Sequence, residues 1–231
     1  MEIISNKIIE LYKKIFKDIS KKTFEDSLLK KYSYCNKLKK HNVKILFITD
    51  THDCLAYEKD TLEFIKSIKE YDACILLGDH SAKDLEEILK IVPNNKIYGV
   101  LGNHDSWDKY ELHNINNING KVVHIKGMKV AGIGGSYKYK TTNQYSMYSH
   151  EESIAIADSM EEADILISHD KPFTTKQYGD AHDGLKGITK YIYKNHIPIH
   201  IHGHIHQENQ EILKNGTTSI CLYKVKYIEL W

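Results

Sequence analysis

From residue 43 onward, short apolar runs alternate with segments of helical periodicity, and this order restricts the possible folds more than any other feature. The runs at 43–49, 73–79 and 96–103 are short and apolar, as buried strands are. Between them, 61–71 and 82–92 repeat apolar residues at three- and four-residue steps, as amphipathic helices do. Strands that alternate with helices predict a parallel sheet covered on both faces, and therefore an α/β fold class.

The second half of the chain continues with strands and helices, and it contains no internal repeat. We expect two short strands after residue 121, a loop rich in Tyr and Ser over 136–149, and a helix over 149–160. A strand over 163–169 and a helix near 184–194 follow, and the last third of this half reads as further strands. The whole of 43–231 therefore suits one domain.

Residues 1–42 differ from the rest of the chain. Apolar residues recur there at helical spacing, and a second helix is expected after a capping-box-like "TFED" at 23–26. The segment carries eleven Lys against five Asp and Glu. We expect a helical N-terminal extension packed on the domain with solvated lysines, and a basic arm for membrane or nucleic acid is the alternative.

Polar clusters follow five of the apolar strands. Because the carboxyl ends of strands in open α/β sheets border the ligand crevice, these side chains should gather at one edge. Single Asp, Asn or His residues at such places often only cap helices or satisfy local hydrogen bonds. Five clusters together predict a metal site, since crowded carboxylates and imidazoles without a cation would repel one another. The clusters are Asp50 and His52, Asp79 and His80, Asn103 to Asp105, His169 and Asp170, and His204 and His206.

The set D-x-H, G-D, G-N-H-D, a later His and G-H-x-H, in that order, resembles the calcineurin-like metallophosphoesterases. The resemblance spans Asp50 to His206 and implies an α/β (α+β) domain, in which a two-sheet β-sandwich is flanked by helices. It also implies the role of each residue. By resemblance, one metal is held by Asp50, His52 and His206, the other by Asn103, His169 and His204, with Asp79 bridging the two, His104 as the non-ligand histidine beside the scissile bond, and Asp105 orienting His104.

These roles agree with the chemistry of the residue types. Two divalent cations would polarise a phosphoryl group and activate a bridging water as the attacking hydroxide, while His104 would protonate the leaving oxygen or stabilise the developing charge. Nitrogen and oxygen ligands without thiolate suit Mn²⁺, Fe, Zn²⁺, Ni²⁺ or Co²⁺. The sequence contains no Arg, so metals would replace the guanidinium groups that often hold phosphate.

The expected substrate is a small phosphodiester or a nucleotide. The chain lacks the D-R-G block of phosphoprotein phosphatases, and its 179–192 segment looks like that of small bacterial phosphodiesterases. His182 and Asp183 in that segment are candidate substrate-binding residues, although Asp183 equally suits a helix cap. Tyr and Lys residues of the 136–149 loop could stack a base, or simply pack on the sheet. A nuclease for single-stranded nucleic acid and a non-catalytic metal-binding scaffold are the alternatives.

Bulk properties set the expected environment. The formal net charge of +1 gives no overall attraction to nucleic acid or anionic membranes. The chain begins without a signal-peptide pattern, and no apolar run approaches the roughly 18 residues of a membrane span. Its four Cys show no C-x-x-C spacing. These features predict a soluble, cytoplasmic protein, and they leave its oligomeric state open.

Overall fold

The computed structural model of this protein describes residues 42–230, apart from 56, 142–143 and 174–180. The helical extension expected over 1–42 therefore lies outside the described residues, except for its last position. Among the described residues, no helix has the length and apolar character needed to span a membrane.

Five α-helices and one short 3₁₀ helix lie in the described part of the chain, together with thirteen strands. The helices are α3 (Lys59–Ser67), α4 (Ala82–Leu89), η1 (Asn94–Lys96), α5 (Lys109–Leu112), α6 (His150–Ser159) and α7 (Lys186–Lys194). The strands are β1 (Val43–Thr49), β2 (Ala73–Leu76), β3 (Ile97–Gly99), β4 (Asn116–Asn117), β5 (Lys121–Ile125), β6 (Met128–Ile133), β7 (Ser136–Tyr137), β8 (Met147–Tyr148), β9 (Ile165–Ser168), β10 (Ile199–His202), β11 (Asn209–Ile212), β12 (Thr218–Cys221) and β13 (Lys224–Leu230).

These strands form two large sheets, each with a parallel centre. The first has the order β13-β1-β2-β3-β4, in which β1 to β4 are parallel and β13 is antiparallel to β1. The second has the order β11-β12-β10-β9-β6-β5, in which β12, β10, β9 and β6 are parallel. Its two edge strands, β11 and β5, are antiparallel to their neighbours.

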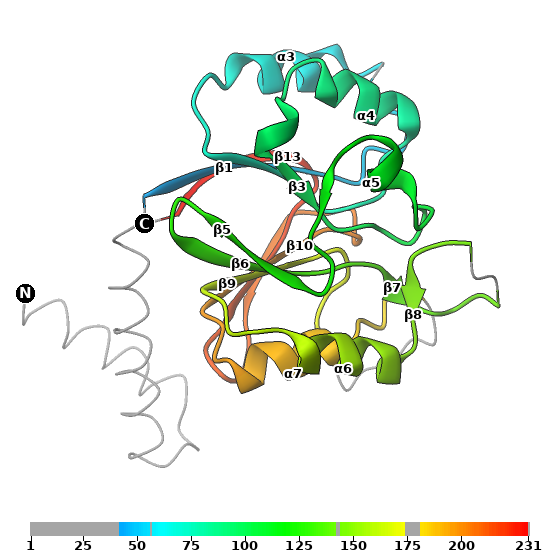
Figure 1. The fold of residues 1–231 in the computed structure, drawn as a ribbon, viewed down its shortest axis with the longest axis vertical. Helices are drawn as coiled ribbons and strands as arrows, with labels where there is room; N and C mark the ends of the chain where they lie inside the picture. The colour runs from blue at the N-terminus through cyan, green and yellow to red at the C-terminus, as the bar shows by residue number, and fades with distance from the viewer. Residues whose placement is uncertain (1–41, 56, 142–143, 174–180, 231) are drawn as a thin grey trace, which may run out of the picture.

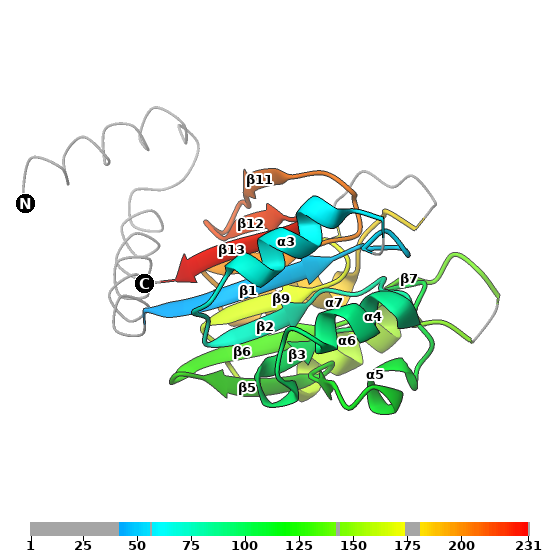
Figure 2. The ribbon, with the colours of Figure 1, turned by 90° about the horizontal axis from the view of Figure 1, so that it is seen from above.

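The two sheets pack face to face, and helices cover the outer face of each. Figure 1 shows α3 and α4 over the first sheet and α6 and α7 over the second, and Figure 2 shows the same stack from above. The central core lies between the two sheets. It combines buried residues of β1 and β2 with residues of β6, β9 and β10, and Phe47, Ile167 and Ile201 are among them. The predicted two-sheet β-sandwich flanked by helices is therefore confirmed.

Strand β1 illustrates why the apolar runs become buried strands. Successive side chains of a strand point to opposite faces, so a strand that is buried on both sides must be apolar throughout. In β1, Ile45 and Phe47 belong to the core between the sheets, whereas Leu46 and Ile48 pack beneath the helices of the first sheet. Burial of both faces explains why "VKILFIT" is apolar apart from Lys44 and Thr49.

Helix caps and turns account for several element boundaries. Ser81 begins α4 by accepting a hydrogen bond from the Asp84 backbone, and Ser149 with Glu152 forms a capping box at the start of α6. Several elements are shorter than their patterns predict: β3 ends at Gly99 rather than 103, and α4 ends at Leu89 rather than 92. The residues after β3 instead leave the sheet to form a loop, and that loop carries part of the candidate site.

Candidate metal centre

The seven predicted metal ligands gather where the strands of the two sheets end. Asp50 directly follows β1, and His169 directly follows β9. Asp79, Asn103 and His204 come two to four residues after β2, β3 and β10 respectively. The edge is formed jointly by both sheets, because parallel strands of each sheet deliver their carboxyl ends to it.

Hydrogen bonds between the sheets hold these loops together. The His169 ring contacts the Leu77 carbonyl through Nδ1 at 2.6 Å, which links the second sheet to the first. In the other direction, the backbone amide of His204 donates to Asp50 Oδ2 at 3.0 Å. Within the first sheet, the Asp50 amide donates to the Gly78 carbonyl at 3.0 Å. The site therefore depends on the packing of the whole sandwich.

The backbone is unusual at the ligands themselves. Five of the seven have positive φ angles, namely Asp50, His52, Asp79, His204 and His206, with values from 44° to 68°. Non-glycine residues rarely adopt this conformation, which costs of order 1–3 kcal/mol each and tends to persist at functional sites. These turns lie where side chains from separate loops come together in one small volume.

Glycines allow these loops to approach closely. A Cβ atom at Gly78 would lie 2.8 Å from His169 Nδ1, and one at Gly102 would lie 2.6 Å from the Asp79 backbone nitrogen. Both distances are shorter than carbon and nitrogen tolerate without bonding. The Gly before each of the two ligand-bearing loops is therefore required by space, and at Gly78 also by a φ of 97°.

The first group of candidate ligands comprises Asp50, His52 and His206. Asp50 Oδ1 lies 3.3 Å from His206 Nε2 and 3.9 Å from His52 Nε2, and the two imidazole nitrogens are 3.0 Å apart. Asp50 is fully buried, whereas both histidines are exposed. This group consequently forms the solvent-facing side of the site.

The second group comprises Asp79, His169 and His204, all buried, and Asn103 adjoins it. His169 Nε2 lies 3.5 Å from Asp79 Oδ2 and 2.9 Å from Asn103 Oδ1. His204 donates from Nε2 to the Ala181 carbonyl at 2.8 Å, which leaves its Nδ1 lone pair available.

Asp79 links the two groups. Its Oδ1 accepts a hydrogen bond from the His104 backbone amide at 2.8 Å. Its Oδ2 lies 3.5 Å from His169 Nε2 in the second group and 3.8 Å from His52 Nε2 in the first. One carboxylate oxygen thus faces both groups, as a ligand shared by two cations must.

Buried carboxylates and imidazoles shift one another's pKa values in this site. Burial alone would raise the pKa of Asp50, but His206 and His169 outweigh it and lower the pKa to about 2. Burial acts in the same way on Asp79, and the neighbouring His169 lowers the pKa of Asp79 below its usual range. Burial also opposes a charge on His169, yet Asp79 raises its pKa to about 10. In the metal-free site, protonated His169 therefore faces two ionised carboxylates, and bound cations would replace its positive charge.

The donor atoms fit a pair of metal ions. Among the described residues, buried Asp50 Oδ1 has no hydrogen-bond partner, only its ion-pair contacts with His206 and His52, whereas Oδ2 is bonded to Thr49 and His204. Burial lowers the pKa of His204 to about 3, so its imidazole is neutral and able to bind metal. Since a carbonyl only accepts, the Leu77 contact puts a proton on Nδ1 of His169 and directs Nε2 towards the site.

His104 lies at the exposed face of the site and is not a member of either group. Its ring meets the His52 ring edge-on, with centroids 5.5 Å apart. Asp105, which we predicted would orient His104, has other partners among the described residues. Its Oδ2 accepts from the backbone amides of Asp79 and Gly102, both at 2.8 Å, and its Oδ1 is 2.5 Å from Lys109 Nζ. Asp105 therefore ties two site loops together.

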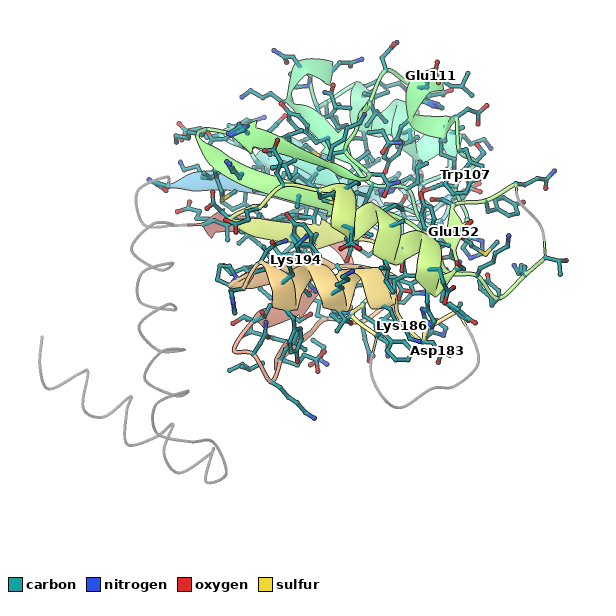
Figure 3. All side chains as sticks on the ribbon, turned by 60° about the horizontal axis from the view of Figure 1, so that its bottom comes forward. Trp107, Glu111, Glu152, Asp183, Lys186 and Lys194 are labelled. Carbon is teal, nitrogen blue, oxygen red and sulfur yellow. The ribbon has the colours of Figure 1, made fainter. Side chains whose placement is uncertain are left out.

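Of the two candidate substrate-binding residues, His182 lies beside the second group. The His182 ring lies over that of His204, with centroids 4.9 Å apart and planes inclined by 30°. Asp183 is buried, and Figure 3 shows it at the N-terminal end of α7 beside Lys186. The N-cap of α7 is Leu185, without a side-chain cap bond, so Asp183 is not the cap of this helix.

Two further residues near the site had no metal or catalytic role in the sequence-based prediction: His80, grouped there with Asp79, and Tyr139, one of the loop tyrosines that could stack a base. His80 is buried against the site, where its Nδ1 lies 2.9 Å from Thr51 Oγ1 and burial lowers its pKa. Tyr139 brings its hydroxyl to 3.4 Å from Asn103 Nδ2. His80 directly follows a predicted ligand in the sequence, and this position could have indicated that it lies near the site. The position of Tyr139 depends on the path of its loop, which the sequence does not indicate.

Comparisons with known proteins point to one family. Residues 43–208 match the family Calcineurin-like phosphoesterase. A protein of Haemophilus influenzae, described as uncharacterized, is 28% identical over 204 residues, which cover 71% of this chain and 83% of that protein.

Solved structures share the fold at low identity. A crystal structure of a protein from Thermus thermophilus has a TM-score of 0.56 at 14% identity and covers 81% of this chain and 99% of its own. The phosphopantetheinyl hydrolase of Mycobacterium tuberculosis has a TM-score of 0.58 at 10% identity, with 81% and 96% covered. The family match spans most of the sandwich and every candidate ligand, and the chain belongs to the calcineurin-like phosphoesterase family.

Proposed function

We propose that residues 43–231 form a phosphodiesterase domain that needs two divalent metal ions and acts on small phosphodiesters or nucleotides. The observation that carries this proposal is the position of Asp79, whose Oδ2 faces His52 on one side and His169 on the other. A single carboxylate placed between two sets of donors suits a two-metal site, and such sites catalyse hydrolysis of phosphate esters.

Each side chain has a role in this proposal. Asp50, His52 and His206 hold one ion, while Asn103, His169 and His204 hold the other, and Asp79 contacts both. When bound, the ions would supply Lewis-acid polarisation of the phosphoryl group and a water of lowered pKa. Imidazole and carboxylate donors without thiolate suit Mn²⁺, Fe, Zn²⁺, Ni²⁺ or Co²⁺.

His104 acts from the open side of the site. Its backbone is fixed, because its amide donates to Asp79 Oδ1, and its exposed ring remains accessible to a substrate. We assign to this imidazole the transfer of a proton to the leaving oxygen. His182, at the edge of the second group, and Asp183, which follows it in the chain, would contact the part of the substrate that lies beyond the phosphate.

Hydrolysis assays on the full chain test the proposal. Metal-stripped protein would be assayed with bis-p-nitrophenyl phosphate, p-nitrophenyl phosphate and cyclic nucleotides, with and without Mn²⁺. We expect Mn²⁺-dependent turnover of the diesters. The Asp79→Asn variant is the matched control, because it keeps the side-chain size and removes the charge shared by the two groups.

Other results would redirect the assignment. Turnover of the monoester alone would refute the diesterase assignment. Cleavage of single-stranded DNA or RNA would identify a nuclease instead. A non-catalytic scaffold would be indicated if the protein as purified, before metal is stripped, carries less than one tightly bound transition metal ion per chain and stays inactive with added Mn²⁺.

A further inference from the structure

The loop rich in Tyr, over 136–149, is fastened to the segment that carries Asn103 and His104. The Gly135 amide, just before the loop, donates to the Leu101 carbonyl at 2.6 Å. At the far end, the Ser146 amide donates to the Asp105 carbonyl at 3.0 Å, and Tyr145 pairs with Ser106. The loop therefore begins and ends on the same short stretch of the site.

Tyr139 extends from this loop towards Asn103. The Asn103 amide group donates from Nδ2 to the Tyr139 hydroxyl at 3.4 Å. The tyrosine is half-buried, and the ammonium group of Lys140 lies over its ring, 4.8 Å from the centroid. The ring is thus held between the site and a cation, with its hydroxyl directed at one end of the carboxamide.

The orientation of that carboxamide matters for metal binding. A carboxamide has an oxygen that can bind a cation at one end and an NH₂ group that cannot at the other. In Asn103 the oxygen lies 2.9 Å from His169 Nε2 and so faces the second group. Turned by 180°, the same side chain would present NH₂ hydrogens to the cation. A tyrosine hydroxyl can accept from NH₂ or donate to a carboxamide oxygen, so the contact with Tyr139 fixes where the carboxamide lies, while His169 and the cation select the end that carries the oxygen.

We propose that Tyr139 is a positioning residue, which holds the Asn103 carboxamide with its oxygen facing the second metal ion. This inference rests on the proposed function, because it takes Asn103 and His169 as metal ligands. It assigns to the 136–149 loop a role in assembling the metal centre. Residues that orient metal ligands in this way typically change metal affinity or activity by about 10- to 100-fold when replaced.

Calorimetric titration of the metal-stripped full chain with Mn²⁺ tests the proposal. Tyr139→Phe removes only the hydroxyl, and we expect one of the two Mn²⁺ ions, that of the second group, to bind about 10-fold less tightly. Turnover of bis-p-nitrophenyl phosphate should fall at limiting Mn²⁺ and recover at saturating Mn²⁺. Tyr145→Phe is the matched control, since it removes a hydroxyl from a 37% exposed tyrosine of the same loop.

A second background tests whether the effect acts through Asn103. Ala at position 103 has no carboxamide for Tyr139 to hold. In the Asn103→Ala protein, Tyr139→Phe should therefore not weaken Mn²⁺ binding further. An equal loss in the Asn and Ala backgrounds would overturn the proposal. So would unchanged Mn²⁺ affinity in Tyr139→Phe, with or without a loss of kcat at saturating metal.

The wild-type protein separates this inference from the proposed function. If the wild-type chain binds fewer than two Mn²⁺ ions and hydrolyses none of the phosphoesters, the two-metal function fails, and the inference fails with it. If the wild-type chain binds two ions and is active, the proposed function stands, and the Tyr139→Phe result then tests only the positioning role. Thermal melting of each variant identifies any loss of affinity that comes from unfolding.

Discussion

Replacement of Asp105 is the most informative perturbation of this site. The side chain is fully buried, and its carboxylate accepts from the backbone amides of Asp79 and Gly102 and from Lys109 Nζ. Asp105→Ala would leave the two amides without this acceptor and Lys109 Nζ without its carboxylate, with the His80 carbonyl at 2.6 Å still accepting from Lys109. The loops that carry Asp79 and Asn103 would then lose the contact that joins them.

The expected cost follows from these partners. Removing one member of a buried ion pair costs about 3–5 kcal/mol, and a buried amide left without a partner costs about 1–3 kcal/mol. These contributions overlap, because water can enter the cavity left by the side chain. We therefore expect Asp105→Ala to lower the free energy of unfolding by about 3–5 kcal/mol. Asp105→Asn keeps an oxygen for the two amides but loses the charge opposite Lys109, and about 1–3 kcal/mol is expected.

Urea denaturation of the metal-stripped full chain, followed by circular dichroism, measures these differences. Asp108→Ala is the matched control, because Asp108 is exposed and its side chain makes no cap bond to α5. Its effect should stay within about 0.5 kcal/mol. An Asp105→Ala protein within about 1 kcal/mol of wild type would refute the view that this carboxylate joins the loops. The same result would reopen the possibility that Asp105 acts on His104.

Three further outcomes are expected. His104→Ala should keep both metal ions, measured by elemental analysis, while hydrolysis of bis-p-nitrophenyl phosphate falls by about 10²–10⁴-fold; loss of metal would contradict its non-ligand role. Asp79→Asn should lose metal and activity together, and full metal content would argue against a shared ligand. The Lys224 hydrogen bond lowers the pKa of Glu58 below its usual 4.5, so this pair stabilises the fold above that pH and its effect disappears as the pH falls. Because Glu58 is partly exposed, Glu58→Gln should lower the free energy of unfolding, measured by urea denaturation, by under about 1 kcal/mol at pH 7 and by less at pH 4. A loss of stability that grew towards pH 4 would contradict this.

The sequence alone determined the fold class and the set of candidate ligands. The burial of runs such as 43–49 can be predicted from the sequence, because a strand covered on both faces is mostly apolar along its whole length. The donor residues follow those runs by a few positions, so the backbone of one strand and one turn is enough to place each of them. Both signals involve residues close together in the sequence, so they can be read from the sequence alone.

The tertiary structure decided which side chains meet. Asp79 lies between two groups only because β2 of the first sheet packs against β9 and β10 of the second. Asp105 contacts Asp79 and Lys109, and Tyr139 reaches Asn103, through loops whose paths are set by contacts between segments distant in the sequence. Such contacts depend on how whole sheets and loops pack, and no spacing of residues along the chain encodes them by itself.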